Sequence, residues 1–470
     1  MTAANPLLPE AWPPAESWRA DDIGSRCPLT GYRWQERDDP MWSGLFDGDS
    51  YAAWSSITQV RRMSETGVAY APKKALARTQ AEAVAAVVSA NGGLTRLRMA
   101  SVVHLWRTVT LPQWAALSGS SRAAEWSSFE ALPLFQSGLV DAGQVRAPGV
   151  GTWAPSANTG LARPGDERVW NRQVSPRLGW TQWLAVSAGF PWSSGRGAGS
   201  DRHNVLATEL GLRLMEAGEV SAVLPEGLCD VGVLAGLAPG TRSTGTADMA
   251  MVRPDGARIS VEVTCNAGEA EKMGAKIRKW VRALGEPNPL ARAAGVVFLV
   301  APRRPSSSAP AALRRLVMRR VAAEVADQGV PDRVARRIGV ASWREWFPSD
   351  RLASREFFDL SVAVLRTTVF GTREWVRESW SCPAPAWGPD TSDQDALSSV
   401  GEQTRVVAGI PRWFRDAGPE PLLAGLLLRA AGRSSFPSRT RPDGMPGRPV
   451  GFGWGAAGPA GAPLALANRL

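Results

Sequence analysis

The chain has 470 residues, which is enough for two or three domains and a large buried core. Its formal net charge of +10 and pI near 10.1 favour a polyanionic partner, and nucleic acid is the expected one. No apolar run approaches the ~20 residues of a membrane-spanning helix, and the N-terminus lacks the pattern of a signal peptide. We therefore expect a cytoplasmic protein with no membrane partner.

The rare residue types exclude several kinds of active site. Two histidines cannot form a three-histidine metal site, and they argue against a serine or cysteine triad. The three tyrosines all lie near the N-terminus, which argues against a tyrosine nucleophile. The four cysteines are far apart, so we expect small buried side chains rather than disulfides or a zinc knuckle.

Residues 1–77 are rich in proline and tryptophan and show no sustained hydrophobic period, which predicts an irregular arm. Disordered segments are poor in aromatic residues, so this arm is expected to be anchored by its indole rings. The tryptophans concerned are Trp12, Trp18, Trp34, Trp42 and Trp54. Docking of these rings onto a domain is the expected role. A platform that stacks nucleic-acid bases is the alternative.

Residues 78–175 have the spacing of a winged helix-turn-helix domain. Helical periodicity begins at Thr79, and a second helix is expected over 97–106. A third helix is expected over Thr110–Leu117, because a threonine caps it and a proline occupies its first turn. After a Ser-Gly-Ser turn, the segment from Ser121 to about Leu132 is expected to be the recognition helix, stopped by Pro133.

Two strand-like segments are expected to form the wing. The first is Gly138–Val140, and Arg168–Asn171 is the expected returning strand. The first turns of the recognition helix place Ser121, Arg122 and Glu125 where base edges are usually contacted. A small helical domain that packs or dimerises without touching DNA is the alternative interpretation.

The C-terminal half predicts a linker, an α/β domain and a tail. Residues 176–200 include a Gly- and Ser-rich stretch and form the linker, residues 201–375 form the domain, and residues 376–470 contain a short helical segment and a flexible tail. Within the domain a helix is expected to start at Asp201, and strands are expected over Val220–Leu224 and Val231–Leu237. A helix through Lys272 to about Leu284 and a buried strand over Gly295–Ala301 follow. This order predicts a mixed sheet.

Two acidic residues stand on neighbouring strands of that domain. Thr246–Val252 and Ala257–Cys265 are expected to pair as a hairpin, and strand alternation puts Glu262 and Thr264 on one face. Asp248 lies on the first strand of the pair. Two carboxylates brought together in this way can hold Mg²⁺ or Mn²⁺, and such a metal can activate water against a phosphodiester.

A lysine stripe follows the hairpin. Only five of the fifty-four basic residues are lysine, and three of them are Lys272, Lys276 and Lys279. Their spacing places them on one helical face. A solvated helix face is the alternative to a functional role.

In its order of motifs the chain resembles the replication-relaxation family of actinobacterial and plasmid proteins, over roughly residues 79–301. The second domain of that family is similar to the PD-(D/E)xK nuclease fold. The resemblance implies that Asp248 and Glu262 bind a metal and that Glu209 supports them. Thr264 stands where that fold carries its lysine, so the amine would come from Lys276 or Lys272, as in relatives with a displaced lysine.

The combined expectation is a DNA-binding protein of plasmid or mobile-element replication or transfer, working with replication or transfer proteins. Its nuclease-like domain would be inactive without a suitably placed lysine; the alternative is a metal-dependent DNA endonuclease using Asp248, Glu262 and Lys276. Simpler interpretations are that Asp248 only starts a strand, that Glu262 pairs with Arg258, and that Glu209 pairs with Arg213.

Overall fold

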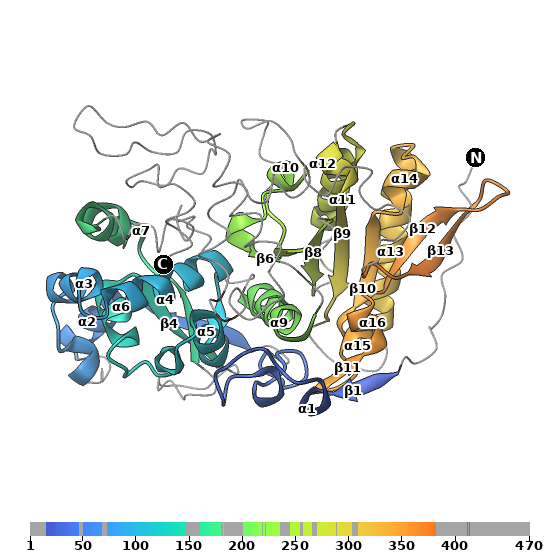
Figure 1. The fold of residues 1–470 in the computed structure, drawn as a ribbon. Coiled ribbons are helices and arrows are strands. Elements are labelled where there is room, and N and C mark those ends of the chain that lie inside the picture. Colours follow the sequence, from blue (N-terminus) through green and yellow to red (C-terminus); the bar gives the residue numbers. More distant parts are fainter. Residues whose placement is uncertain are drawn as a thin grey trace, which may run out of the picture. The chain divides into compact units, whose positions relative to one another are not determined.

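The computed structural model forms two compact units, which are described separately (Figure 1). The seven-strand unit comprises Met1–Ser25, Asp38–Gly48 and Arg213–Ser399, and the four-strand unit comprises Arg26–Arg37, Asp49–Leu212 and Val400–Leu470. The structure describes residues 16–46, 50–67, 73–146, 160–179, 182, 201–218, 220, 222–235, 245–253, 257–265, 270–287, 289–302, 309–381, 411 and 413. Nearly all of the expected linker, and the expected helix and tail after residue 421, lie outside these ranges.

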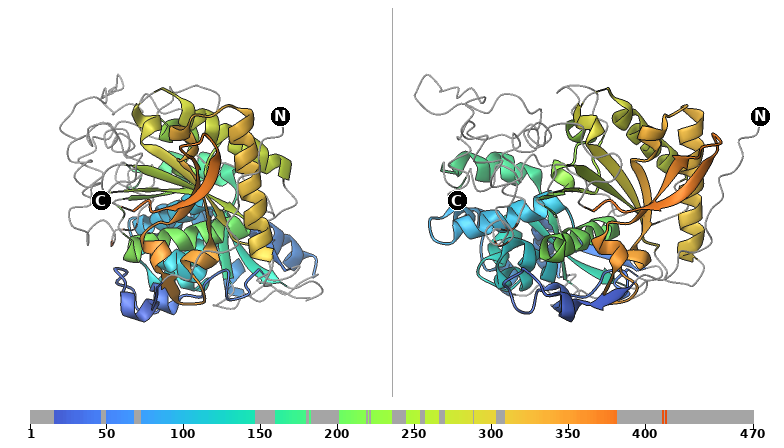
Figure 2. Two further views of the ribbon diagram at one scale, coloured as in Figure 1. Left: turned by 90° about the vertical axis from the view of Figure 1, so that its right-hand side faces the viewer. Right: turned by 45° about the vertical axis from the view of Figure 1, so that its right-hand side comes forward.

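A mixed seven-stranded sheet forms the centre of the first unit, and its twist is visible in Figure 2. In spatial order its strands are β13 (Arg373–Glu378), β12 (Val362–Thr367), β10 (Ile338–Ser342), β9 (Ala294–Val300), β8 (Arg258–Thr264), β7 (Met249–Val252) and β6 (Ala222–Pro225). The three central strands β8, β9 and β10 run parallel, while the strands on either side pair antiparallel. This mixed sheet with helices confirms the expected α/β class.

Two long helices connect the parallel strands, since parallel neighbours need a crossover. α11 (Ala270–Gly285) joins β8 to β9, and α13 (Ala309–Asp327) joins β9 to β10. All seven residues of β9 are buried, as is usual for a central parallel strand. The predicted hairpin is confirmed, because β7 and β8 pair antiparallel with Met249 opposite Val261.

Short elements complete the seven-strand unit. They are β1 (Ser17–Arg19), α1 (Ala20–Ile23), η6 (Glu226–Leu228), α10 (Val231–Leu234), α12 (Pro289–Arg292), α14 (Asp332–Ala335), α15 (Trp343–Trp346), β11 (Leu352–Ser354) and α16 (Arg355–Phe358). The strand expected over Val231–Leu237 is wrong, since this segment begins with α10. A short apolar run is compatible with a strand or a buried helix, and periodicity cannot separate them.

The four-strand unit combines helices with an antiparallel sheet. Its strands, in spatial order, are β2 (Tyr51–Ser55), β4 (Val140–Arg146), β5 (Gly160–Pro164) and β3 (Val109–Thr110). Its helices are η1 (Trp34–Glu36), α2 (Ile57–Glu65), η2 (Lys73–Leu76), α3 (Gln80–Val88), α4 (Gly93–Trp106), α5 (Leu111–Ser118), η3 (Ser121–Ala124), α6 (Ala131–Ser137), α7 (Glu167–Val169), η4 (Trp170–Val174) and η5 (Ser175–Arg177). Helix α9 (Asp201–Ala217) contributes its residues up to Leu212 to this unit.

The helix starts of this unit follow from their caps. Thr79 accepts a hydrogen bond from the Glu82 amide, and Thr110 accepts one from the Gln113 amide. In each case the third residue of the helix bonds back to the cap, which completes a capping box. Gly119 then ends α5 in the left-handed conformation with φ 68°.

The expected recognition helix is wrong in its position. Residues 121–124 form a 3₁₀ turn, and the next α-helix is α6. Ser128 explains the interruption, because its hydroxyl donates to the Arg122 carbonyl and accepts from the Ala131 amide. Pro133 does not stop a helix; it occupies the first turn of α6, where its missing donor costs nothing.

The wing strands also differ from expectation. β4 begins at Val140, the last residue of the predicted first strand, but its partner is β5 rather than Arg168–Asn171. Residues 167–174 are helical instead, since the Asp166 side chain accepts from the Arg168 amide and caps a helical turn. The loop between β4 and β5 lies outside the described residues.

The N-terminal arm is more regular than its sequence indicates, because β1 pairs with β11 and β2 pairs with β4. Its tryptophans anchor it to the two units. Within the seven-strand unit, Trp42 donates to the Phe347 carbonyl. Within the four-strand unit Trp34 is fully buried and Trp54 donates to Asp201. The contacts of Trp34, Trp42 and Trp54 therefore agree with the expected docking role, while Trp12 lies outside the described residues.

Two simpler expectations concern cysteines and membrane segments. Cys27, Cys229 and Cys265 are buried free thiols, as expected, while Cys382 lies outside the described part of the chain. Among the helices that are described, none combines the length and apolar character needed to cross a membrane.

Candidate functional site

The candidate site lies on β7, β8 and α11 of the seven-strand unit. Asp248 immediately precedes β7, and Glu262 lies within β8. The Asp248 amide donates to the Val261 carbonyl, and its Oδ2 accepts from the Val263 amide at 2.6 Å. These two bonds to the neighbouring strand hold the Asp248 carboxylate beside Glu262.

Glu262 is buried, with 1% of its side chain exposed. Its Oε2 lies 2.6 Å from Nζ of Lys276, and its Oε1 accepts from the Trp280 indole at 2.9 Å. Both partners come from α11, where they are four residues apart and share a helical face. The simpler interpretation, in which Arg258 pairs with Glu262, is therefore replaced by a pair with Lys276.

The lysine of this site comes from the helix and not from the strand. Thr264 ends β8 and is half-buried, and no amine follows Glu262 on the strand. Lys276 brings an amine to the same carboxylate from α11. The structure thus brings Asp248, Glu262 and Lys276 together.

Burial and the neighbouring charges shift the pKa values of Glu262 and Lys276. Burial raises the pKa of Glu262, with Asp248 adding to that rise and Lys276 opposing it. Burial disfavours the charged form of Lys276, but Glu262 and Asp248 outweigh it, so the pKa of Lys276 lies well above its ordinary value. Lys276 is therefore a permanent ammonium at neutral pH and not a proton acceptor.

Further charged groups surround the pair. Glu226 acts on Lys276, and Asp230 acts on Lys279, which lies one turn farther along α11. Burial lowers the pKa of Lys279, with Glu262 and Asp248 opposing that shift. Among the described residues, four carboxylates therefore surround two lysines, and this excess of negative charge favours a cation.

Cys229 is buried near this group of charges, and its thiol donates to the Leu224 carbonyl at 3.2 Å. Burial raises the pKa of its thiol well above the ordinary value, and Glu226, Asp248 and Glu262 raise it further. A thiol in this state stays protonated, and the thiolate is the reactive form.

The sequence did not identify several members of this site. Trp280 could have been found, because it lies one turn beyond Lys276 on the same helical face. Asp230 and Glu226 could not, because the bridge between Asp230 and Thr246 joins positions that are far apart in the sequence. Such long-range pairing leaves no local pattern in the sequence.

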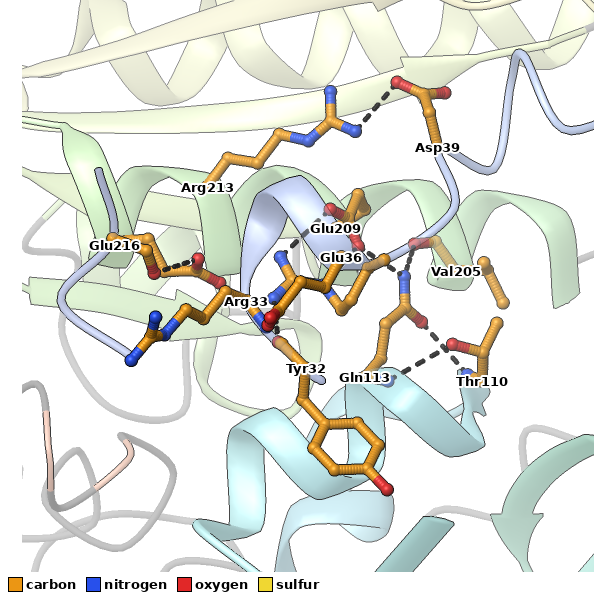
Figure 3. A network of polar contacts seen from close by, with 12 residues as sticks. Tyr32, Arg33, Glu36, Asp39, Thr110, Gln113, Val205, Glu209, Arg213 and Glu216 are labelled. Carbon is orange, nitrogen blue, oxygen red and sulfur yellow. Dashed lines mark hydrogen bonds and ion pairs between the residues drawn. The ribbon is translucent and has the colours of Figure 1, made fainter. Parts of the chain in front are cut away.

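Glu209 does not belong to this site, so its expected role as a supporting metal ligand is not what its contacts show. In the four-strand unit its Oε1 lies 3.0 Å from Nη2 of Arg37, and its Oε2 accepts from Arg37 and Gln113, each at 3.2 Å (Figure 3). Gln113 also donates to the Val205 carbonyl. This carboxylate is fully enclosed in a structural network.

Arg213, the other expected partner of Glu209, makes a separate pair in the seven-strand unit. Its Nη2 lies 2.8 Å from Oδ2 of Asp39, and the same carboxylate oxygen accepts from the Trp343 indole at 3.2 Å. The Arg213 guanidinium also lies over the Phe347 ring (Figure 3 shows the Asp39 contact). Arg37 and Asp39 thus anchor the N-terminal arm through buried charges.

The residues expected to contact DNA lie on and just after η3. Ser121, Arg122 and Glu125 are exposed, and Arg122 pairs with the buried carboxylate of Glu130. In contrast, α6 is buried at every position except Leu132, which is half-buried. Arg61 and Arg78 bond to Gln136 of α6, which also donates to the Lys74 carbonyl, so neighbouring segments cover this helix.

Among the described residues, no group of three or more His, Cys, Asp or Glu side chains is arranged to hold a metal ion. Comparison of the chain with protein-family models, with curated proteins and with solved structures finds no match.

Proposed function

We propose that the protein acts on DNA and cuts phosphodiester bonds with a divalent cation at Asp248 and Glu262. The observation that carries this proposal is the 2.6 Å contact between Lys276 and Glu262 beside Asp248. A strand without its own lysine argued for an inactive nuclease-like domain. An amine supplied from α11 removes that argument.

The topology of both units supports the proposal. In the seven-strand unit the order β6, β7, β8, α11, β9, with β8 parallel to β9, is similar to the core of the PD-(D/E)xK nuclease fold. In the four-strand unit the order α4, β3, α5, α6, β4, β5, with β3 paired to β5, is similar to a winged helix-turn-helix. Both orders agree with the resemblance to the replication-relaxation family.

The donors of the site suit a hard, hydrated cation. Mg²⁺ usually keeps several waters and binds through one or two carboxylates together with substrate phosphates, so a third protein carboxylate is not required. Asp248 is half-buried and offers Oδ1, which accepts no hydrogen bond from the described residues. Oε2 of Glu262 accepts from Lys276 but keeps a second lone pair.

The chain's own groups would divide the remaining work. A bound Mg²⁺ or Mn²⁺ would polarise the phosphodiester and lower the pKa of a water. Asp248 and Glu262 would hold that cation, and Trp280 fixes the orientation of Glu262. Lys276 stays positively charged, so it can stabilise negative charge on a phosphate but cannot accept the proton of the attacking water.

DNA binding without cleavage is the second candidate function. It is favoured by the Lys276 ammonium, which already neutralises Glu262 as a metal would. In this account, Arg122 and its exposed neighbours supply affinity, and the protein positions DNA for replication or transfer proteins of a plasmid or mobile element. Arg122→Ala should then weaken binding by about 1–3 kcal/mol if it contacts a base.

Incubation of the purified chain with plasmid DNA in Mg²⁺, Mn²⁺ or EDTA tests the proposal. We expect nicking or linearisation with either metal and none with EDTA. Asp248→Asn and Glu262→Gln should abolish cleavage, whereas Asp327→Asn and Glu286→Gln, which make the same changes at exposed positions, should not. Intact plasmid under all conditions, with retained binding, would establish the second candidate instead.

A further inference from the structure

Lys279 differs from its neighbour Lys276 in having no direct partner. Among the described residues it makes no hydrogen bond or ion pair, although Glu262, Asp230 and Asp248 act on it at longer range. It is half-buried on α11, three residues beyond Lys276. An ammonium group has three donors, and partial burial without acceptors makes such a group costly.

The Lys279 ammonium lies very close to the backbone at Gly245. A Cβ built on Gly245 would lie 2.6 Å from Nζ of Lys279, closer than real contacts allow. Gly245 has φ +84°, a conformation that favours glycine, and its carbonyl accepts from the Val231 amide. The segment leading to Asp248 thus approaches the ammonium closely because it carries no side chain at this point.

From this arrangement we infer that Lys279, beside the Gly245 backbone, forms an anion subsite that binds a non-bridging phosphate oxygen of the DNA strand. The inference rests on the proposed function, and it assigns separate tasks to the two lysines. Lys276 is held on the metal-binding carboxylate, while Lys279 keeps its donors for the substrate. A lysine acts as a point charge on phosphate, so the subsite would not select a base sequence.

The surrounding carboxylates set a condition on this subsite. Asp230, Asp248 and Glu262 repel an anion, and among the described residues the ammonium groups of Lys276 and Lys279 oppose that repulsion. A divalent cation at Asp248 and Glu262 would remove this repulsion. Phosphate binding at Lys279 should therefore strengthen when a divalent cation is present.

The rarity of lysine allows a direct measurement. The chain has five lysines, so reductive methylation with ¹³C-formaldehyde yields few signals, and Lys279→Arg identifies that of Lys279. The probe is a short DNA duplex with Ca²⁺ in place of Mg²⁺, to keep the strands intact. We expect the Lys279 signal to shift on addition of duplex and Ca²⁺ together, and to shift less with duplex alone. An unmoved Lys279 signal under saturating duplex would overturn the inference.

Charge-matched variants provide the second measurement. Lys279→Gln should weaken duplex binding in Ca²⁺ about tenfold and reduce the salt dependence by about one ion contact. Arg282→Gln removes the same charge from an exposed position of the same helix and should change the affinity much less. Lys279→Arg should retain most of the affinity. If Lys279→Gln and Arg282→Gln lose equal duplex affinity, Lys279 contributes only through the net charge of the protein and the subsite is ruled out.

Gly245→Ala tests the close approach, because the added methyl group forces the end of the Lys279 side chain to move and places an alanine at φ +84°. It should reduce duplex affinity as Lys279→Gln does, and the double variant should be no weaker than either single one. The two proposals can fail separately. Cleavage with an unmoved Lys279 signal would remove only the subsite, and a shifted signal without cleavage would keep the subsite but remove the nuclease activity.

Discussion

Two buried glutamates of this protein form similar ion pairs in different surroundings. In the four-strand unit, Glu209 and Arg37 have 0% and 1% of their side chains exposed. In the seven-strand unit, Glu262 is 1% exposed, but 44% of the Lys276 side chain is accessible. The N···O distances are 3.0 Å and 2.6 Å, so both are direct contacts. What separates the pairs is the exposure of the cation.

This difference indicates different roles. A pair with both charges enclosed leaves no route for a ligand, and its energy depends on every donor and acceptor being satisfied. Gln113 contributes to that satisfaction at Glu209. The Lys276 pair lies at the edge of the core beside the half-buried Asp248, where a cation or a phosphate can approach. Perturbed carboxylates at such an edge are better functional candidates than enclosed ones.

The largest effect is expected from breaking the enclosed pair. Arg37→Ala would leave the Glu209 carboxylate buried without its cation, which should cost about 3–5 kcal/mol of unfolding free energy. Chemical denaturation followed by tryptophan fluorescence would measure it. Arg37→Met combined with Glu209→Met removes both charges and should recover much of the loss. A loss below about 1 kcal/mol for Arg37→Ala would contradict the structural role of this pair.

A pH dependence is expected from His104, another enclosed group of the four-strand unit. Burial, with Arg107 adding to it, holds the pKa of His104 well below its ordinary value of 6.5. Below pH 6.5, His104 therefore binds a proton in the unfolded chain but stays neutral in the folded chain. Stability should be full above pH 6.5 and fall by about 1.4 kcal/mol per pH unit below it. His104→Met should remove this part of the slope, and an unchanged slope would show that other groups cause it.

The open pair should contribute less to stability. Lys276→Ala removes a cation from Glu262, but the pKa of Glu262 is already raised, so the carboxyl can take up a proton instead. We expect a loss of about 1 kcal/mol or less, after allowing for solvent screening of the exposed side chain. Cleavage, in contrast, should fall strongly. A loss of stability as large as that of Arg37→Ala would place Lys276 among the structural residues.

The sequence predicts the site better than its surroundings because the site depends on local patterns. The pairing of β7 with β8 brings Asp248, which immediately precedes β7, close to Glu262 on β8, and the helical spacing in α11 brings Lys276 to the same carboxylates. The contact between Glu209 and Arg37 could not be predicted, because Arg37 lies 172 residues away in the chain. No periodic pattern reports such a contact.

The four-strand unit shows the same limit. The caps at Thr79 and Thr110 were visible in the sequence, and both helices begin there. The helix expected from Ser121 was not formed, because Ser128 bonds to the backbone and Trp126 packs between Trp114 and Phe135. Tertiary packing overrides helical preference in such a short segment.

The most direct test of the central claim compares the two glutamates under a divalent cation. Mg²⁺ bound at Asp248 and Glu262 should raise the melting temperature of the wild-type chain, by a free energy of RT ln(1 + [L]/Kd). Glu209→Gln should lower the starting stability yet keep the Mg²⁺ response, whereas Glu262→Gln and Asp248→Asn should lose that response. A Mg²⁺ response that survives both Glu262→Gln and Asp248→Asn, or no response in the wild-type chain, would contradict the account.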